Sequence, residues 1–438
     1  CERVFAPWGD MGEEMRREGI PLYGLESGDS IADFDLIGFS LGYEMAYTNV
    51  LNMLDLAGIP LHAADRGESL APIVVAGGPC VCNPEPLADF FDLFIVGEGE
   101  EVNLELMDLY REMKARGAGR RAFLQEAARI PGIYVPSLYT VAYHEDGTIR
   151  EMIPHDGAPQ TIQKRIIPDL DHAFYPDTLV VPFTETVHDR AVEEVLRGCL
   201  RGCRFCQAGF LYRPFREKSP ETINRQCRAL CDNTGYQEIS LSSLSTSDHS
   251  RLSETLEELL PYTESHRVNL TLPSLRVDNF SKELMERIQG VRKSSLTFAP
   301  EAGSQRLRNV INKGLTEEDI LNGSALAFKG GWNRVKLYFM LGLPTETVED
   351  MEGIALLSEK IAEKYYEIPK DQRNGKVQVV ASTSFFVPKP FTPFQWAQMS
   401  TKEEFLGKAR VVNHKMHEML NHKSLKYNWH EADVTVLE

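Results

Sequence analysis

Short apolar segments alternate with amphipathic segments of helical period over residues 1–115 of this chain. This alternation is typical of a parallel sheet that is covered by helices on both faces. The predicted strands are residues 35–41, 72–76 and 93–96, and the predicted helices are residues 11–18, 47–57 and 101–115. We therefore expect an α/β fold that begins with a Rossmann-like domain over residues 1–130.

These predicted strands carry glycines in or just after them: Gly38, Gly77, Gly78, Gly97 and Gly99. In open α/β sheets, ligands bind beyond the carboxyl ends of the strands, where glycine lets the backbone approach a ligand closely. Tight turns need glycine for the same conformational freedom. The pattern thus leaves both readings open at Gly77 and Gly78, a ligand contact or a turn.

The middle of the chain changes character. Residues 138–143 and 148–153 flank an Asp146-Gly147 turn and predict a β-hairpin. The proline-containing residues 154–182 predict an irregular connector, so residues 131–185 form a hairpin-and-connector segment.

A strand–helix alternation returns from residue 191 and repeats six times. The predicted strands are residues 193–197, 238–241, 269–272, 295–298, 334–340 and 377–386; the predicted helices are residues 220–232, 251–263, 282–288, 316–329 and 348–364. Six such units predict a partial (β/α)6 barrel over residues 186–400, with its active site at the carboxyl ends of the strands. A doubly wound sheet is the alternative.

The two ends of the chain carry their own expectations. The chain starts at Cys1 with what resembles the second strand of an α/β unit, so we expect the natural protein to begin earlier. Residues 401–438 predict a helix and the start of a further segment, with residues 433–438 forming a strand.

Composition narrows the function classes. Hydrophobic residues make up 42% and charged residues 25%, which is typical of a folded protein, and no apolar run has the length of a membrane span. The net charge of −17 does not favour a nucleic-acid partner. Eight cysteines are too few for a disulfide scaffold, and their clustering indicates a metal site in a reducing, cytoplasmic environment.

Three of these cysteines, Cys199, Cys203 and Cys206, lie on one loop after the first predicted barrel strand. Thiolates are soft ligands for iron and zinc, and a structural zinc site would need a fourth ligand nearby. The next cysteines, Cys227 and Cys231, lie on a separate predicted helix. Three ligands therefore indicate a [4Fe–4S] cluster with one open iron.

The C-x3-C-x2-C spacing, with Phe205 before the last cysteine, resembles the radical S-adenosylmethionine (SAM) superfamily. The resemblance implies that SAM chelates the open iron and is cleaved reductively to a 5′-deoxyadenosyl radical, which abstracts hydrogen from a substrate. It also implies a small electron donor such as flavodoxin or ferredoxin.

Further SAM contacts follow from this resemblance. Where many members have Gly-Gly-Glu after the second strand, this chain has Ser242 and Ser243, so hydroxyls or carbonyls would replace the carboxylate. The other residues matched to SAM-binding positions are Ser274, Arg276, Glu301, Gly342 and Pro344, with Phe205 beside the cluster. A turn or a helix cap is the alternative reading at each of them.

The whole chain resembles radical SAM proteins with an N-terminal cobalamin-binding-like domain, and more narrowly an uncharacterised bacterial family with Ala76-Gly77-Gly78-Pro79-Cys80 and Gly97-Glu98-Gly99-Glu100. Cobalamin binding is left open, because the segment that often carries an axial histidine is absent and His62 lies elsewhere. If cobalamin binds, we expect no histidine of this chain to ligate cobalt. The alternative is a domain that only docks on the barrel.

The reaction class has three candidates. The first is a radical enzyme that modifies an unknown substrate by methyl transfer or C–H functionalisation. The second is a methylthiotransferase-like modifier of tRNA or a ribosomal protein, although Cys1, Cys80 and Cys82 do not match the widely separated cysteines of its second cluster. The third is an iron–sulfur electron carrier or sensor. We expect Cys80 and Cys82 in a strand-end loop and Cys227 and Cys231 on the inner face of a helix.

Overall fold

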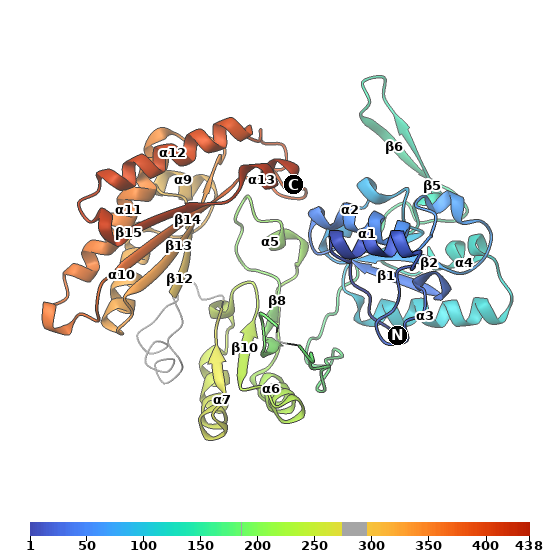
Figure 1. The fold of residues 1–438 in the computed structure, drawn as a ribbon, viewed down its shortest axis with the longest axis horizontal. Coiled ribbons are helices and arrows are strands. Elements are labelled where there is room, and N and C mark those ends of the chain that lie inside the picture. Colours follow the sequence, from blue (N-terminus) through green and yellow to red (C-terminus); the bar gives the residue numbers. More distant parts are fainter. Residues whose placement is uncertain (185, 274–295) are drawn as a thin grey trace. The chain divides into compact units, whose positions relative to one another are not determined.

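The computed structural model describes residues 1–184, 186–273 and 296–438, which divide into two compact units, Cys1–Pro168 and Asp169–Glu438 (Figure 1). Within the first unit, a sheet of order β1-β2-β3-β4 has three parallel strands followed by one antiparallel strand. These strands are β1 (Leu36–Ser40), β2 (Ile73–Gly77), β3 (Leu93–Ile95) and β4 (Ile133–Tyr134). The predicted parallel sheet is confirmed, and β4 is an addition to it.

Both faces of this sheet are covered, as the strand periodicity predicts. Val74 and Ala76 of β2 pack against α1 (Gly9–Glu18) and α2 (Tyr47–Leu56), whereas Ile73 and Val75 pack against α3 (Gly99–Ala115) and α4 (Arg120–Ala127). Successive residues of a strand point to opposite faces, so one apolar run fills two cores.

The hairpin is also confirmed, as β5 (Tyr139–Tyr143) paired antiparallel with β6 (Ile149–Pro154), and it extends away from the rest of its unit in Figure 1. The strand expected at the start of the chain is wrong: residues 1–8 form no strand. Arg3 instead accepts from the Leu25 N–H and pairs with Glu26, so this segment bonds to a turn and not to the sheet.

Among its described residues, the second unit has seven parallel strands in two hydrogen-bonded groups, β11-β10-β7 and β12-β13-β14-β15. Their bounds are β7 (Ala191–Glu194), β10 (Glu238–Ser242), β11 (Asn269–Thr271), β12 (Leu296–Glu301), β13 (Arg334–Leu341), β14 (Gln378–Phe385) and β15 (Leu425–Trp429). Six of them correspond to the predicted barrel strands, and β15 extends the second group beyond the prediction.

Helices follow these strands in the predicted alternation. They are α6 (Pro220–Thr234), α7 (Leu252–His266), α10 (Glu317–Lys329), α11 (Val348–Tyr366) and α12 (Lys402–Glu418). Helices α10, α11 and α12 lie on one side of the β12–β15 group and share one apolar core with it (Figure 1). The helix predicted for residues 282–288 lies outside the described residues. None of the helices that the structure describes is long and apolar enough to cross a membrane.

Two predicted strands need correction. Residues 193–197 are not one strand: β7 ends at Glu194, and β8 (Leu196–Arg197) pairs antiparallel with β9 (Arg216–Glu217). Residues 433–438 lie in α13 (Ala432–Leu437), not in a strand. Ala432 and Thr435 are its buried residues, a spacing of three that matches the helical period instead of the alternation of a strand.

Candidate functional site

The three-cysteine loop begins at Gly198, directly after β8. Gly198 has a positive φ of 93°, and a Cβ there would lie 2.7 Å from the Tyr212 carbonyl oxygen and 2.9 Å from that of Pro214. Only glycine combines this conformation with so close an approach of two backbone segments. The residue therefore lets the chain leave β8 in a tight turn and present the cysteines together.

Two later segments of the second unit hold the end of this loop. The Asn312 side-chain amide donates to the Gly202 carbonyl at 2.9 Å, and the Arg204 N–H donates to the Ile311 carbonyl at 2.9 Å. The Phe394 N–H donates to the Arg204 carbonyl at 3.3 Å. The loop is thus fixed by hydrogen bonds to the turn after α9 (Gln305–Val310) and to a proline-rich segment after β14.

The cysteines differ in exposure: Cys203 is buried, whereas Cys199 and Cys206 are half-buried. Burial raises the pKa of the Cys206 thiol, so a thiolate there needs a nearby cation such as iron. In the described part of the chain, no three His, Cys, Asp or Glu side chains converge as ligands of a single ion. The ligands of an iron–sulfur cluster bind different irons, and three soft sulfur donors on one fixed loop fit such a cluster.

Glu301 ends β12 beside this loop and has a positive φ of 65°, which is unusual for a residue with a side chain. Its carboxylate pairs with the Lys313 ammonium at 3.1 Å, and their side chains are 16% and 11% exposed. The Lys313 nitrogen lies 6.0 Å from the centre of the Phe205 ring. Both charges act electrostatically on Cys206, so the structure brings Glu301 and Phe205 together with the cysteines.

Lys313 is a residue that the sequence reasoning missed. Asn312, Lys313 and Gly314 are a short polar segment between a predicted strand and a predicted helix, and this was the available signal. Because the turn follows α9 and not the strand itself, only the tertiary fold shows that it returns to the cysteine loop.

Ser242 and Ser243 lie at the end of β10 and line a cavity of about 460 Å³ with Gly198, Glu194 and Tyr212. The Ser243 hydroxyl shares a hydrogen bond of 2.9 Å with that of Thr246. The two serines therefore lie beside the start of the cysteine loop. Ser274 and Arg276 lie outside the described residues.

Gly342 and Pro344 line a different cavity, of about 710 Å³, against α12. Gly342 has a φ of 83°, a Cβ there would lie 2.6 Å from the Phe405 ring, and its N–H donates to Glu346 at 2.9 Å. Packing of the chain against itself thus accounts for the glycine at this position.

Close packing within the first unit also explains two of its glycines. A Cβ at Gly78 would lie 2.7 Å from the Leu41 carbonyl oxygen, and one at Gly97 would lie 2.3 Å from that of Arg165. A Cβ at Gly77 would have no atom within 4 Å. Of these three, Gly77 alone borders open space.

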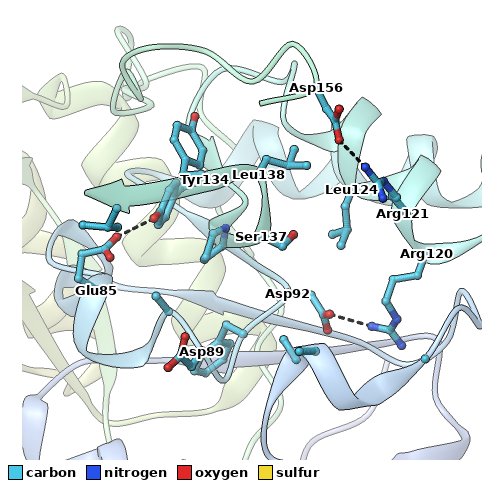
Figure 2. A pocket seen from close by; sticks show the side chains of 18 of the residues that line it. Glu85, Asp89, Asp92, Arg120, Arg121, Leu124, Tyr134, Ser137, Leu138 and Asp156 are labelled. Atoms are coloured by element: carbon cyan, nitrogen blue, oxygen red, sulfur yellow. Dashed lines mark hydrogen bonds and ion pairs between the residues drawn. The ribbon is translucent and has the colours of Figure 1, made fainter. Parts of the chain in front are cut away.

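The first unit also has a cavity of about 640 Å³ (Figure 2), which lies near the amino ends of β2 and β3. Asp92, directly before β3, pairs with Arg120 at 2.8 Å and with Arg66 at 3.0 Å. At the other end, Tyr134 donates to Glu85 at 2.6 Å, and Arg121 pairs with Asp156 at 2.9 Å. Asp92, Arg120, Arg121, Asp156 and Glu85 are thus each engaged with a neighbouring side chain.

The remaining cysteines lie where the sequence predicts. Cys80 and Cys82 belong to a 3-10 helix, η4 (Pro79–Cys82), that follows β2, and Cys80 is buried. Cys227 and Cys231 lie on α6 and pack into the core beneath β7 and β10. Burial raises the pKa of the Cys231 thiol to about 11, which suits a neutral core residue.

Comparison with known proteins assigns both units to radical SAM proteins. Residues 1–136 match the family described as radical SAM proteins, N-terminal, and residues 194–357 match the radical SAM superfamily. The uncharacterized protein MJ0966 of Methanocaldococcus jannaschii is 32% identical over 384 residues, which cover 87% of this chain and 73% of that protein. The putative methylthiotransferase MJ0865 of the same organism is 28% identical over 195 residues, 42% of each chain.

Among solved structures, the radical SAM methyltransferase TsrM from Kitasatospora setae, with cobalamin and a [4Fe–4S] cluster bound, has a similar fold. The TM-score is 0.55 at 14% identity, over 88% of this chain and 66% of the TsrM chain. This likeness concerns the fold, and the chain spans about two thirds of TsrM.

An α/β unit, then a barrel whose first strand leads into a three-cysteine loop, defines a class of iron–sulfur barrel enzymes. The chain belongs to the radical SAM superfamily. It is therefore an enzyme whose cofactors are a [4Fe–4S] cluster and SAM. This confirms the resemblance and excludes a mere electron carrier.

Proposed function

We propose that Cys199, Cys203 and Cys206 hold the [4Fe–4S] cluster and leave one iron open for SAM. The observation that carries this proposal is the fixed loop that presents three sulfur donors beside the carboxyl ends of the barrel strands. The bound cluster supplies the electron that cleaves SAM to methionine and a 5′-deoxyadenosyl radical. A small reductant such as flavodoxin or ferredoxin delivers that electron.

Glu301 and Lys313 orient SAM in this proposal. They place a carboxylate and an ammonium 3.1 Å apart beside Cys206 and Phe205, and both side chains are largely buried. A zwitterionic amino-acid group needs both signs of charge in one place. Ser242 and Ser243 offer hydroxyls from the neighbouring strand end, and we propose Ser274 and Arg276 as further contacts.

We propose methyl transfer to an unknown substrate as the overall reaction. The support is the fold shared with TsrM, a methyltransferase, over most of this chain. The second candidate is methylthio transfer, supported by the partial match to MJ0865. It requires a second cluster, and the cysteines available in the first unit are exposed Cys1 and the η4 pair Cys80 and Cys82.

We further propose that the first unit binds cobalamin without a histidine ligand. Its three histidines lie away from the carboxyl ends of β1–β3: His62 packs on Phe90, His144 flanks the hairpin turn, and His155 bonds to Thr140. Gly77 leaves open space at that edge, whereas Gly78 and Gly97 serve internal packing and add no support.

Anaerobic incubation with SAM and dithionite tests the central proposal, because a radical SAM enzyme releases 5′-deoxyadenosine. Iron and sulfide counting separates the two reaction candidates, one cluster for methyl transfer and two for methylthio transfer. Reconstitution with hydroxocobalamin and gel filtration tests the first unit. A protein that retains no corrinoid contradicts the cobalamin proposal, as does a Co(II) spectrum with imidazole coupling.

A further inference from the structure

The first half of the cysteine loop is tied to the barrel by a bidentate ion pair. The Arg201 guanidinium contacts both carboxylate oxygens of Asp248, Nη2 to Oδ1 at 2.5 Å and Nε to Oδ2 at 3.2 Å. The Asp248 side chain is only 4% exposed and that of Arg201 is 34% exposed. Two parallel charge-assisted hydrogen bonds fix orientation as well as distance.

Asp248 is itself held on a rigid element. It ends the 3-10 helix η7 (Thr246–Asp248), which follows β10, and its N–H donates to the Ser245 carbonyl at 3.0 Å. The Thr246 hydroxyl donates to the Leu241 carbonyl of β10 at 3.2 Å. The Asp248 carboxylate therefore holds the loop in a fixed position relative to the barrel strand β10.

Arg201 lies two residues from Cys199 and two from Cys203, and its own N–H donates to the Cys199 sulfur at 3.4 Å. Gly198 and Gly202 flank residues 199–201 and give the backbone conformational freedom there. Another contact is therefore needed to fix this part of the loop. Asn312 and Ile311 hold the second half, at Gly202 and Arg204. The pair with Asp248 supplies the corresponding hold for the first half.

We propose that Arg201 and Asp248 are positioning residues that fix Cys199 and its N–H···S hydrogen bond for the cluster. This inference rests on the proposed function of the three cysteines. Hydrogen bonds to cluster sulfurs stabilise the more negative, reduced state and so raise its reduction potential. Loss of the pair should loosen cluster binding and make the potential more negative.

The test uses Arg201→Lys, Asp248→Asn and the double variant in the full chain, reconstituted anaerobically. Arg201→Lys keeps the charge but removes the planar fork, so a change of potential reports geometry. Glu254→Gln is the matched control, because it breaks the Arg251–Glu254 pair, whose side chains are each 44% exposed, on α7 of the same unit. Circular dichroism melts establish that each variant folds.

The half-life of the visible cluster absorbance in a chelator should fall about tenfold in each single variant, as for other residues that support metal ligands. The double variant should be no worse than the singles, because the two residues act as one unit. In a titration followed by paramagnetic resonance, the potential of Arg201→Lys should be more negative than that of the wild type. The Glu254→Gln control should match the wild type in both measurements.

Wild-type half-lives in both single variants, an unchanged potential in Arg201→Lys, or additive losses in the double variant would overturn the positioning role. If Asp248→Asn does not fold, Arg201→Lys alone decides, since it retains charge and most of its length. A wild-type protein that takes up no cluster would instead overturn the proposed function, so the two failures are distinguishable.

Discussion

Buried charge serves two different ends in the two units of this protein. In the first unit, Asp92 lies between Arg66 and Arg120, and the Val74 N–H also donates to it. Arg66 also donates to the Pro60, Leu61 and Phe90 carbonyls, and Arg120 to that of Pro72. Apart from Arg120 Nε, which has no partner in the described structure, the network is satisfied within the fold.

In the second unit, the Arg201–Asp248 and Glu301–Lys313 pairs surround a loop of cysteines and are partly open to solvent. Arg201 belongs to that loop, and the Lys313 nitrogen lies 6.0 Å from the centre of the Phe205 ring on the same loop. A charge network saturated by backbone carbonyls stabilises a fold, whereas charged pairs beside sulfur donors can act on a ligand. The groups that surround the charged side chains, and not the burial of those side chains, distinguish the two networks.

The largest effect is expected at the cysteines. On the proposed assignment, replacing Cys199, Cys203 or Cys206 by alanine removes one of three cluster ligands, and three are the minimum that leaves a single open iron. Each variant should lose both the visible thiolate–iron absorbance and the release of 5′-deoxyadenosine. A single variant that cleaves SAM at the normal rate would contradict the assignment.

The saturated network should matter for stability and not for SAM cleavage. Asp92→Asn leaves two buried guanidinium groups without a counter-charge, so the free energy of unfolding should fall by about 3–5 kcal/mol. Asp156→Asn, which breaks the exposed Arg121 pair on the same cavity wall, should leave the free energy of unfolding close to that of the wild type. Urea denaturation of both variants measures the difference, and equal losses would refute the contrast drawn here.

The open pair should matter for SAM binding. Glu301→Gln keeps the size of the side chain but removes its charge, and a hydrogen bond to a charged group is worth about 1.5–3 kcal/mol. SAM affinity should therefore fall about tenfold or more, with the cluster spectrum unchanged. We expect the same from Arg276→Ala. Calorimetric titration with SAM is the measurement, and normal affinity in both variants would assign these residues a structural role.

The smallest effect concerns pH and a third buried pair, Glu193 of β7 with Lys218 at 2.8 Å. Burial raises the pKa of Glu193 to about 7, against the opposing effect of Lys218. The pKa of Glu193 is thus higher in the folded than in the unfolded state, so the protonated carboxyl stabilises the fold at low pH. This stabilisation is lost as pH rises through about 7. As pH rises through about 7, the melting temperature should therefore fall more in the wild type than in Glu193→Gln. Parallel profiles of melting temperature against pH would contradict the raised pKa.

Local patterns were sufficient for most elements of this fold. The apolar patterns predict the strands and the helices of both units, because residues 73–76, for example, are a continuous buried run and residues 348–364 repeat buried positions at helical spacing. Where the pattern was short, prediction failed: residues 433–438 have the composition of a strand but the burial spacing of a helix. Tertiary contacts decide such short segments.

The sequence by itself determined the class of this protein, because the spacing of three cysteines within eight residues can be read without the rest of the chain. The tertiary structure decided which residues from distant parts of the chain contact the cysteine loop. Lys313, Asn312 and Asp248 come from segments 47 or more residues away from the loop residues that they contact, since parallel strands bring their carboxyl ends to one edge. Such neighbours have no local signature, because their contact with the cysteines is created by the closing of the fold.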